Sequence, residues 1–328
     1  MTAGKDRHFL KSILFFVYDM KKNESKSKKA AAVAKDAPAD ANEPVNQEQS
    51  AAKAEEPAAE ADVPVTEELV EGPLILSDDP TAEAVTILVM LTCDDDNAFM
   101  LRHSLRSLSR FLRGVSAEVK VIGREKPDWL PASAWLDVSD ATDTSNWNSL
   151  VCRATTLVNT ERIVLMTDRM FLIRPVNLAD IAVLKAEVGT LGNKTIRQLY
   201  DLMGTTKREV WNYHTNMPAL FFKSTLLQVI DYMFGHLKGD DFDLPTAYFN
   251  LIYPELRPTL LDWSHDGWLL PIVSEHPDIE RAKTFFETKK FMHVASRYGQ
   301  EVVSLLKFLT PDPSPFEADT ENENPAKD

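Results

Sequence analysis

The stretch VTILVMLTCDDD, residues 85–96, decides the fold of this chain. Its apolar run from Val85 to Thr92 is almost uninterrupted, which is typical of a central strand whose two faces are both covered. Three carboxylates, Asp94, Asp95 and Asp96, follow the run directly. Ligands in open α/β sheets bind beyond the carboxyl ends of strands. The stretch therefore predicts an α/β domain with a polar edge suited to ligand binding.

Helices and strands alternate after this first strand. We predict a helix from about Asn97 to Arg113, on which Arg102, Arg106 and Arg110 form a stripe because they repeat every four residues. The next strand is predicted over residues 118–123 by its alternation and β-branching.

A second helix is predicted to begin near Asn146, and it leads to the strand RIVLM, residues 162–166. That strand runs directly into Thr167, Asp168 and Arg169. The order strand, helix, strand, loop, helix, strand predicts a mostly parallel sheet flanked by helices, with its polar loops on one edge.

The chain outside this domain differs in composition. Residues 23–82 are dominated by Ala, Glu, Asp, Lys, Pro and Gln, so this segment cannot recover its ordering entropy by burial. We predict a disordered acidic linker over 23–82, one folded domain over 83–310 and a polar C-terminal tail over 311–328.

Residues 1–22 hold an amphipathic element, HFLKSILFFVYDMKK (8–22), whose apolar residues fall on one helical face. The long linker favours a segment that inserts into a groove of a partner protein. A membrane-surface anchor and docking on the chain's own domain are the alternatives. Lys11 within the apolar run counts against a secretory signal.

Composition excludes several classes of protein. The net charge of −14 argues against a broad nucleic-acid-binding face. The two cysteines, Cys93 and Cys152, cannot form a disulfide framework and lack the spacing of a zinc site. No apolar stretch is long enough to span a membrane. We expect a soluble, cytoplasmic protein that its N-terminal segment could recruit to an assembly or a membrane surface.

Four sequence blocks stand in a recognisable order, namely FMLRHSLRSL (99–108), VKVIGREKPDWL (119–130), NWNSL (146–150) and IVLMTDRMFLIRPV (163–176). In order and spacing they resemble the motifs of the Stealth family of sugar-phosphate and glycosyl transferases. Looser matches follow at NYHTNMPALFFK (212–223), TAYFN (246–250) and PSPFE (313–317). The resemblance implies a GT-A-like nucleotide-diphospho-sugar transferase fold.

The resemblance also implies a nucleotide-sugar donor, such as a UDP-sugar, and a saccharide or other hydroxyl acceptor. A divalent cation, Mn²⁺ or Mg²⁺, usually neutralises the leaving diphosphate of such donors. Asp168 stands at the position of the family's acidic motif, as a candidate metal ligand and catalytic residue. The second acid of that motif is replaced by Arg169, whose guanidinium could contact the diphosphate instead. Alternatively, Asp168 only caps a turn.

Arg102, Arg106 and Asn148 are further candidates for donor binding because they match residues of these motifs. Asp94, Asp95 and Asp96 are candidates because they directly follow the first strand. The three aspartates could contact uracil, ribose or metal, or else cap the helix that follows them. The two arginines could reach a phosphate, or else form salt bridges on a solvated face.

The acceptor needs a base, and here the chain departs from the family. Relatives carry a His two residues before a Pro, where this chain has Asn216, which cannot act as a general base. His214 could substitute if the loop were re-registered. Asp262 is a further candidate catalytic acid, although Trp263 and Trp268 around it equally suit a packed loop.

Two hypotheses remain open from the sequence. The first is a transferase that moves a sugar or sugar phosphate from a nucleotide donor to a hydroxyl acceptor. The second is a catalytically decayed member of that fold, a pseudoenzyme that serves as a binding or structural protein. The replacements at Arg169 and Asn216 support the second hypothesis.

Overall fold

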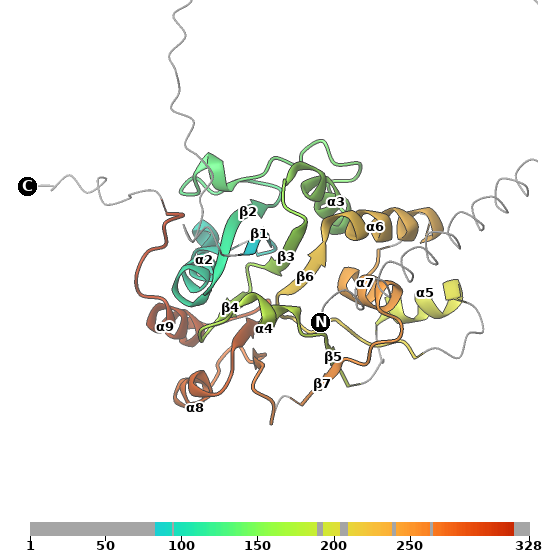
Figure 1. The fold of residues 1–328 in the computed structure, drawn as a ribbon. Coiled ribbons are helices and arrows are strands. Elements are labelled where there is room, and N and C mark those ends of the chain that lie inside the picture. Colours follow the sequence, from blue (N-terminus) through green and yellow to red (C-terminus); the bar gives the residue numbers. More distant parts are fainter. Residues whose placement is uncertain are drawn as a thin grey trace, which may run out of the picture. The chain divides into compact units, whose positions relative to one another are not determined.

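The computed structural model describes residues 83–93, 95–188, 193–203, 209–237, 241–262 and 265–317 (Figure 1). The predicted segments 1–22 and 23–82 lie outside these residues, as do Asp94 and residues 318–328. Within the described part of the chain, every helix is too short or too polar to cross a membrane.

A four-stranded sheet with the order β2-β1-β3-β6 forms the centre of the described region. Its first strand, β1 (Glu83–Met90), pairs in parallel with β2 (Val115–Ile122) and with β3 (Arg162–Thr167). The edge strand β6 (Ala219–Phe222) runs antiparallel to β3. The predicted mostly parallel α/β sheet is therefore confirmed.

Helices cover both faces of this sheet. Because β2 and β3 flank β1 on opposite sides, right-handed crossovers place their connecting helices on opposite faces. These helices are α2 (Phe99–Phe111) and α3 (Trp147–Leu157) (Figure 1). Every residue from Val85 to Val89 is buried, so double coverage explains the uninterrupted apolar run. Ile87 of β1 and Leu105 of α2 belong to the same apolar cluster.

A second sheet has the strand order β4-β9-β8. Its strand β4 directly follows β3 of the first sheet in the sequence. Its strands are β4 (Met170–Leu172), β8 (Leu269–Ile272) and β9 (Phe291–Val294). The helices α8 (Ile279–Thr284) and α9 (Gln300–Leu309) share an apolar cluster with these strands.

The remaining elements build the other side of the domain. The short strands β5 (Lys185–Glu187) and β7 (Thr259–Leu261) pair in parallel. Three helices follow, α5 (Lys194–Met203), α6 (Lys223–Leu237) and α7 (Leu244–Ile252). α7 contacts both other helices, and α6 also contacts α3 and β6 (Figure 1). Single turns complete the fold: η1 (Asp96–Ala98), η2 (Ala132–Ala134), α4 (Leu178–Ala182) and η3 (Phe285–Glu287).

The folded part of the chain reaches beyond the boundary predicted at residue 310. The Phe316 side chain is fully buried. Glu317 forms salt bridges with Arg102 and Arg106 of α2, at 3.3 and 2.6 Å. Residues 311–317 are therefore packed against the domain, because they supply an aromatic side chain to its core and a carboxylate to its arginines.

Candidate functional site

A cavity of about 780 Å³ lies at the carboxyl ends of β1 and β3. Thr92 follows β1 and Thr167 ends β3, and both line it. Its floor includes apolar side chains such as Met166 and Met217. The cavity lies at the strand edge where the sequence predicts ligand binding.

Three helices begin at this cavity, and each start is stabilised by a side chain. Asn146, Asn193 and Asp243 accept hydrogen bonds from backbone amides two or three residues further on, at 2.8, 3.0 and 2.9 Å. These residues precede α3, α5 and α7, and side chains in that position typically fix the first helical turn. The positive ends of three helix dipoles are thereby held at one cavity.

His214 and Asp243 form a close pair on the cavity wall, with 2.6 Å between His214 Nδ1 and Asp243 Oδ1. The Asp243 carboxylate raises the pKa of His214 above its usual value, and Glu187 adds to this effect. An ionised carboxylate only accepts hydrogen bonds, so Nδ1 must carry the proton. In the neutral imidazole, Nε2 is then the free base, as in other His–carboxylate pairs.

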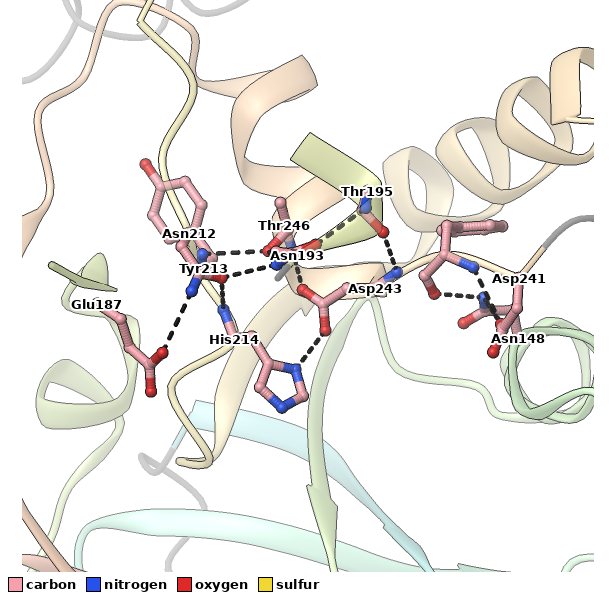
Figure 2. Close-up of polar contacts among 11 residues, drawn as sticks. Asn148, Glu187, Asn193, Thr195, Asn212, Tyr213, His214, Asp241, Asp243 and Thr246 are labelled. Carbon is pink, nitrogen blue, oxygen red and sulfur yellow. Dashed lines mark hydrogen bonds and ion pairs between the residues drawn. The ribbon is translucent and has the colours of Figure 1, made fainter. Parts of the chain in front are cut away.

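A chain of hydrogen bonds holds this pair in place (Figure 2). Asn212 Oδ1 accepts from Asn193 Nδ2 at 2.7 Å and from the His214 amide at 3.2 Å. Asn212 Nδ2 donates to Glu187 Oε2 at 3.2 Å. Thr246 Oγ1 accepts from Asn193 Nδ2 at 3.3 Å, which joins the network to α7. Four separate segments of the chain are thereby fixed around His214.

Asn148 lies on the opposite part of the same wall and is buried. Its amide donates to Phe242 O at 2.8 Å and to Asp241 Oδ1 at 3.2 Å, so it joins α3 to the segment before α7 (Figure 2). The sequence predicts Asn148 as a donor-binding residue, and the structure places it on the cavity. Lys194 is the only lysine or arginine among the described lining residues.

Asp168 does not line the cavity, and its carboxylate is fully buried. Its oxygens accept from the Thr92 amide at 3.1 Å, the Thr92 hydroxyl at 2.6 Å and the Cys93 amide at 2.8 Å. Burial raises the pKa of Asp168, although these hydrogen bonds oppose the shift. The carboxylate thus ties the end of β3 to the end of β1. Its use as a metal ligand or catalytic acid at the cavity does not fit this arrangement, because the carboxylate is fully buried and does not line the cavity.

Arg169 and Asp95 also have partners outside the cavity. Arg169 Nε donates to Cys93 Sγ at 2.9 Å. Asp95 Oδ2 accepts from the Met100 amide and the Tyr298 hydroxyl, at 2.9 and 2.8 Å. Asp95 thus accepts a hydrogen bond from an amide in the first turn of α2. This agrees with the alternative in which the aspartates stabilise the start of the following helix.

The side chains of Asp94 and Asp96 lie outside the described residues. The two arginines of α2 lie away from the cavity lining, with Glu317 as partner. The two arginines thus form salt bridges, which is the alternative to phosphate binding. The face of α2 that carries them is covered by the C-terminal segment and is not the solvated face of that alternative. Asp262 is likewise absent from the lining and lies in an exposed pair with His265, at 3.0 Å.

Among the described residues, no group of three or more His, Cys, Asp and Glu side chains is arranged to hold a metal ion. The cavity has the carboxylates of Glu187, Asp241 and Asp243 on its wall. Asp243 is already engaged with His214, and Asp241 with Asn148. The fit of the residues present to a divalent cation is therefore poor.

Several lining residues are missed by sequence reasoning, namely Glu187, Asn193, Lys194, Thr195, Asp241 and Asp243. A signal exists for Asp243 in the run DLPT, where an acid precedes Leu, Pro and Thr at a helix start. Glu187 carries no such signal, because an acid after a short strand is common on any surface.

No protein-family model matches this chain, and no curated protein does. Among solved structures, the chain is similar to the galactosyltransferase LgtC in complex with donor and acceptor sugar analogs. The TM-score is 0.35 and the sequence identity is 9%, and the match covers 64% of this chain and 87% of that chain. It is also similar to the glycosyltransferase GlyE of Streptococcus pneumoniae TIGR4, with a TM-score of 0.35 and 9% identity over 65% of this chain and 54% of that chain. A third is a glycosyltransferase involved in the glycosylation of the major capsid of PBCV-1, with a TM-score of 0.33 and 11% identity over 70% of this chain and 100% of that chain. At these TM-scores the similarity carries no inference about activity, and the GT-A-like assignment rests on the sequence resemblance.

Proposed function

We propose that this chain transfers a sugar or sugar phosphate from a nucleotide donor to a hydroxyl acceptor at the cavity described above. The observation that carries the proposal is the His214–Asp243 pair on the wall of a polar cavity beyond the parallel strands. Three of the sequence blocks of the Stealth resemblance, residues 146–150, 163–176 and 212–223, supply residues of the cavity lining, among them Asn148, Thr167 and His214. The motifs and the cavity support the same assignment independently.

In this proposal the starts of α3 and α5 bind the donor diphosphate, with Lys194 assisting, whereas the Asp243 carboxylate at the start of α7 is paired with His214. Helix N-termini favour anions because their amides and dipoles point at the ligand. A lysine ammonium adds charge stabilisation as the leaving group becomes more negative. No step is assigned to a metal ion, because Asp168 does not fit the role of a ligand.

His214 is the proposed base. The acceptor oxygen forms a bond to the anomeric carbon or the phosphorus atom of the donor, and its proton passes to His214 Nε2. The bond between that atom and the leaving phosphate oxygen breaks, so the nucleotide leaves with the electron pair. Asp243 orients the imidazole and stabilises the imidazolium that forms.

Calorimetry on the full chain tests the donor site, with UDP and GDP as probes and with or without Mn²⁺. We expect one of the two nucleotides to bind, and Lys194→Ala to weaken its binding about tenfold through the loss of one charge-assisted contact. Lys283→Ala is the matched control, since Lys283 lies on α8 and pairs with Glu280 outside the cavity. Binding of neither nucleotide to the wild-type chain would overturn the proposal.

A binding protein without transferase activity is the second candidate. The burial of Asp168 supports it, because the acid at the family's motif position accepts hydrogen bonds from the Thr92 and Cys93 amides and does not line the cavity. Incubation with UDP-sugars separates the candidates. A transferase hydrolyses or transfers the sugar of a bound donor, whereas a decayed enzyme binds the nucleotide and leaves the donor intact.

A further inference from the structure

A second depression adjoins the cavity and is not used by the donor. It has a volume of about 280 Å³, and we call it the Trp211 groove. Its lining includes Glu187, Tyr200, Glu209, Trp211, Asn212 and Leu260. Glu187 and Asn212 line both the groove and the cavity. The groove therefore shares a wall with the site of the proposed base.

That shared wall is well defined. The Glu187 amide donates to Asn212 O at 2.8 Å, and Asn212 Nδ2 donates back to Glu187 Oε2 at 3.2 Å. The Oδ1 atom of the same Asn212 accepts from the His214 amide at 3.2 Å. A ligand lying in the groove is thus separated from the His214 loop by a single residue.

The backbone of Trp211 is held in position by two hydrogen bonds. Its amide donates to Asn250 Oδ1 at 2.9 Å, and its carbonyl oxygen accepts from Asn250 Nδ2 at 2.8 Å. Asn250 itself is buried in α7. The two hydrogen bonds fix the backbone on both sides, while the side chain remains partly exposed. Because the backbone that carries the ring is fixed, less conformational freedom is lost when the ring contacts a ligand.

The remaining lining indicates which ligand chemistry suits the groove. Tyr200 is 43% exposed and Leu260 is 45% exposed, so apolar surface faces solvent here. The carboxylates of Glu187 and Glu209 stand beside this surface. An anion is disfavoured by the two carboxylates, and a lipid chain would bury charges without partners.

A sugar ring combines the two properties that this lining requires. Its C–H face is apolar and packs on aromatic rings, while its hydroxyls donate to carboxylates and accept from amides. We propose that the Trp211 groove binds a saccharide unit of the acceptor, next to the unit whose hydroxyl reacts at His214. This inference rests on the proposed function and makes the acceptor an oligosaccharide or glycoside of at least two units.

A glycan array probed with the labelled full chain tests the inference. We expect the wild type to bind a subset of oligosaccharides, and Trp211→Ala to reduce that signal about tenfold, as the loss of one aromatic stacking contact predicts. Tyr200→Ala tests the same groove from α5, where the side chain is exposed and its removal leaves the core unchanged. Phe308→Ala is the control, because Phe308 is a 60% exposed aromatic on α9.

The outcomes separate this inference from the proposed function. Absence of glycan binding by the wild type, or equal binding by Trp211→Ala and the wild type, overturns the groove assignment. Nucleotide binding that persists in Trp211→Ala shows that the donor cavity is intact in that variant. Glycan binding without nucleotide binding would retain the groove as a carbohydrate site and reject the transferase.

Discussion

The contact between His214 Nδ1 and Asp243 Oδ1 decides the proton affinity of the imidazole in the cavity. Asp243 raises the pKa of His214 above its usual value. A base with a raised pKa is protonated, and therefore inactive, up to a higher pH than a free histidine. Transferase activity should therefore increase with pH, and the midpoint of this increase should lie above about 6.5, the pKa of an unperturbed histidine.

Asp243→Asn tests this assignment at the residue scale. The neutral amide no longer stabilises the imidazolium, so the rising limb of the activity profile should move to lower pH. We also expect kcat at pH 7.5 to fall by about one to two orders of magnitude. Asparagine still caps a helix, so α7 should remain intact. The measurement is product formation across pH, and an unmoved limb would contradict the role of the pair.

The control for this experiment is a second His–carboxylate pair outside the cavity. His276 Nδ1 lies 3.0 Å from Glu301 Oε2, and both side chains are exposed. His276→Gln should leave both kcat and the pH profile unchanged, because neither residue lines the cavity.

At the scale of single elements, the segment after α9 forms part of the domain. Its Phe316 is fully buried, whereas Phe308, the second-to-last residue of α9, is exposed. Phe316→Ala should reduce the free energy of unfolding by about 3–5 kcal/mol through loss of burial and creation of a cavity. Phe308→Ala should cost less than about 1 kcal/mol. Urea denaturation of both variants measures the difference, and equal costs would show that the segment is not packed.

Element boundaries show where sequence reasoning succeeds and where it stops. The helix predicted from about Asn97 is regular only from Phe99, because Asn97 and Ala98 have φ values of 55° and 49°. Asn146 is the residue before α3, as its capping side chain predicts. The hydrophobic pattern thus identifies these two helices, while the exact start depends on local backbone geometry.

For the whole molecule, the buried His103 and the half-buried His293 make folding dependent on pH. Burial is the main cause that lowers the pKa of His103 to about 4 and the pKa of His293 to about 4. Both groups are neutral in the folded and unfolded chains above about pH 6.5. Below that value the unfolded chain binds protons more readily, so stability falls as pH decreases from about 6.5 to about 4.

His103→Gln should reduce this dependence. In the wild type we expect the free energy of unfolding to be lower at pH 5 than at pH 7.5. His103 and His293 should each contribute on the order of 1–2 kcal/mol to this difference. The variant should lose the contribution of His103 to this difference. Denaturant unfolding of both proteins at the two pH values measures the change. An equal pH dependence in both proteins would exclude His103 as a source of this dependence.

The sequence by itself determined the central sheet, because an uninterrupted apolar run requires burial of both faces and alternating helices require parallel strands. It also determined the edge at which the cavity lies. Only the tertiary structure decided which polar residues reach that cavity. Asn148, Asn212 and Asp243 are distant in the chain. They line one cavity because α5 packs against α7 and because Asn148 of α3 bonds to the segment before α7, whereas Asp168 turns into the core between two strand ends. Residue type and spacing specify which faces are buried, but the side chains that share a cavity depend on contacts between distant segments.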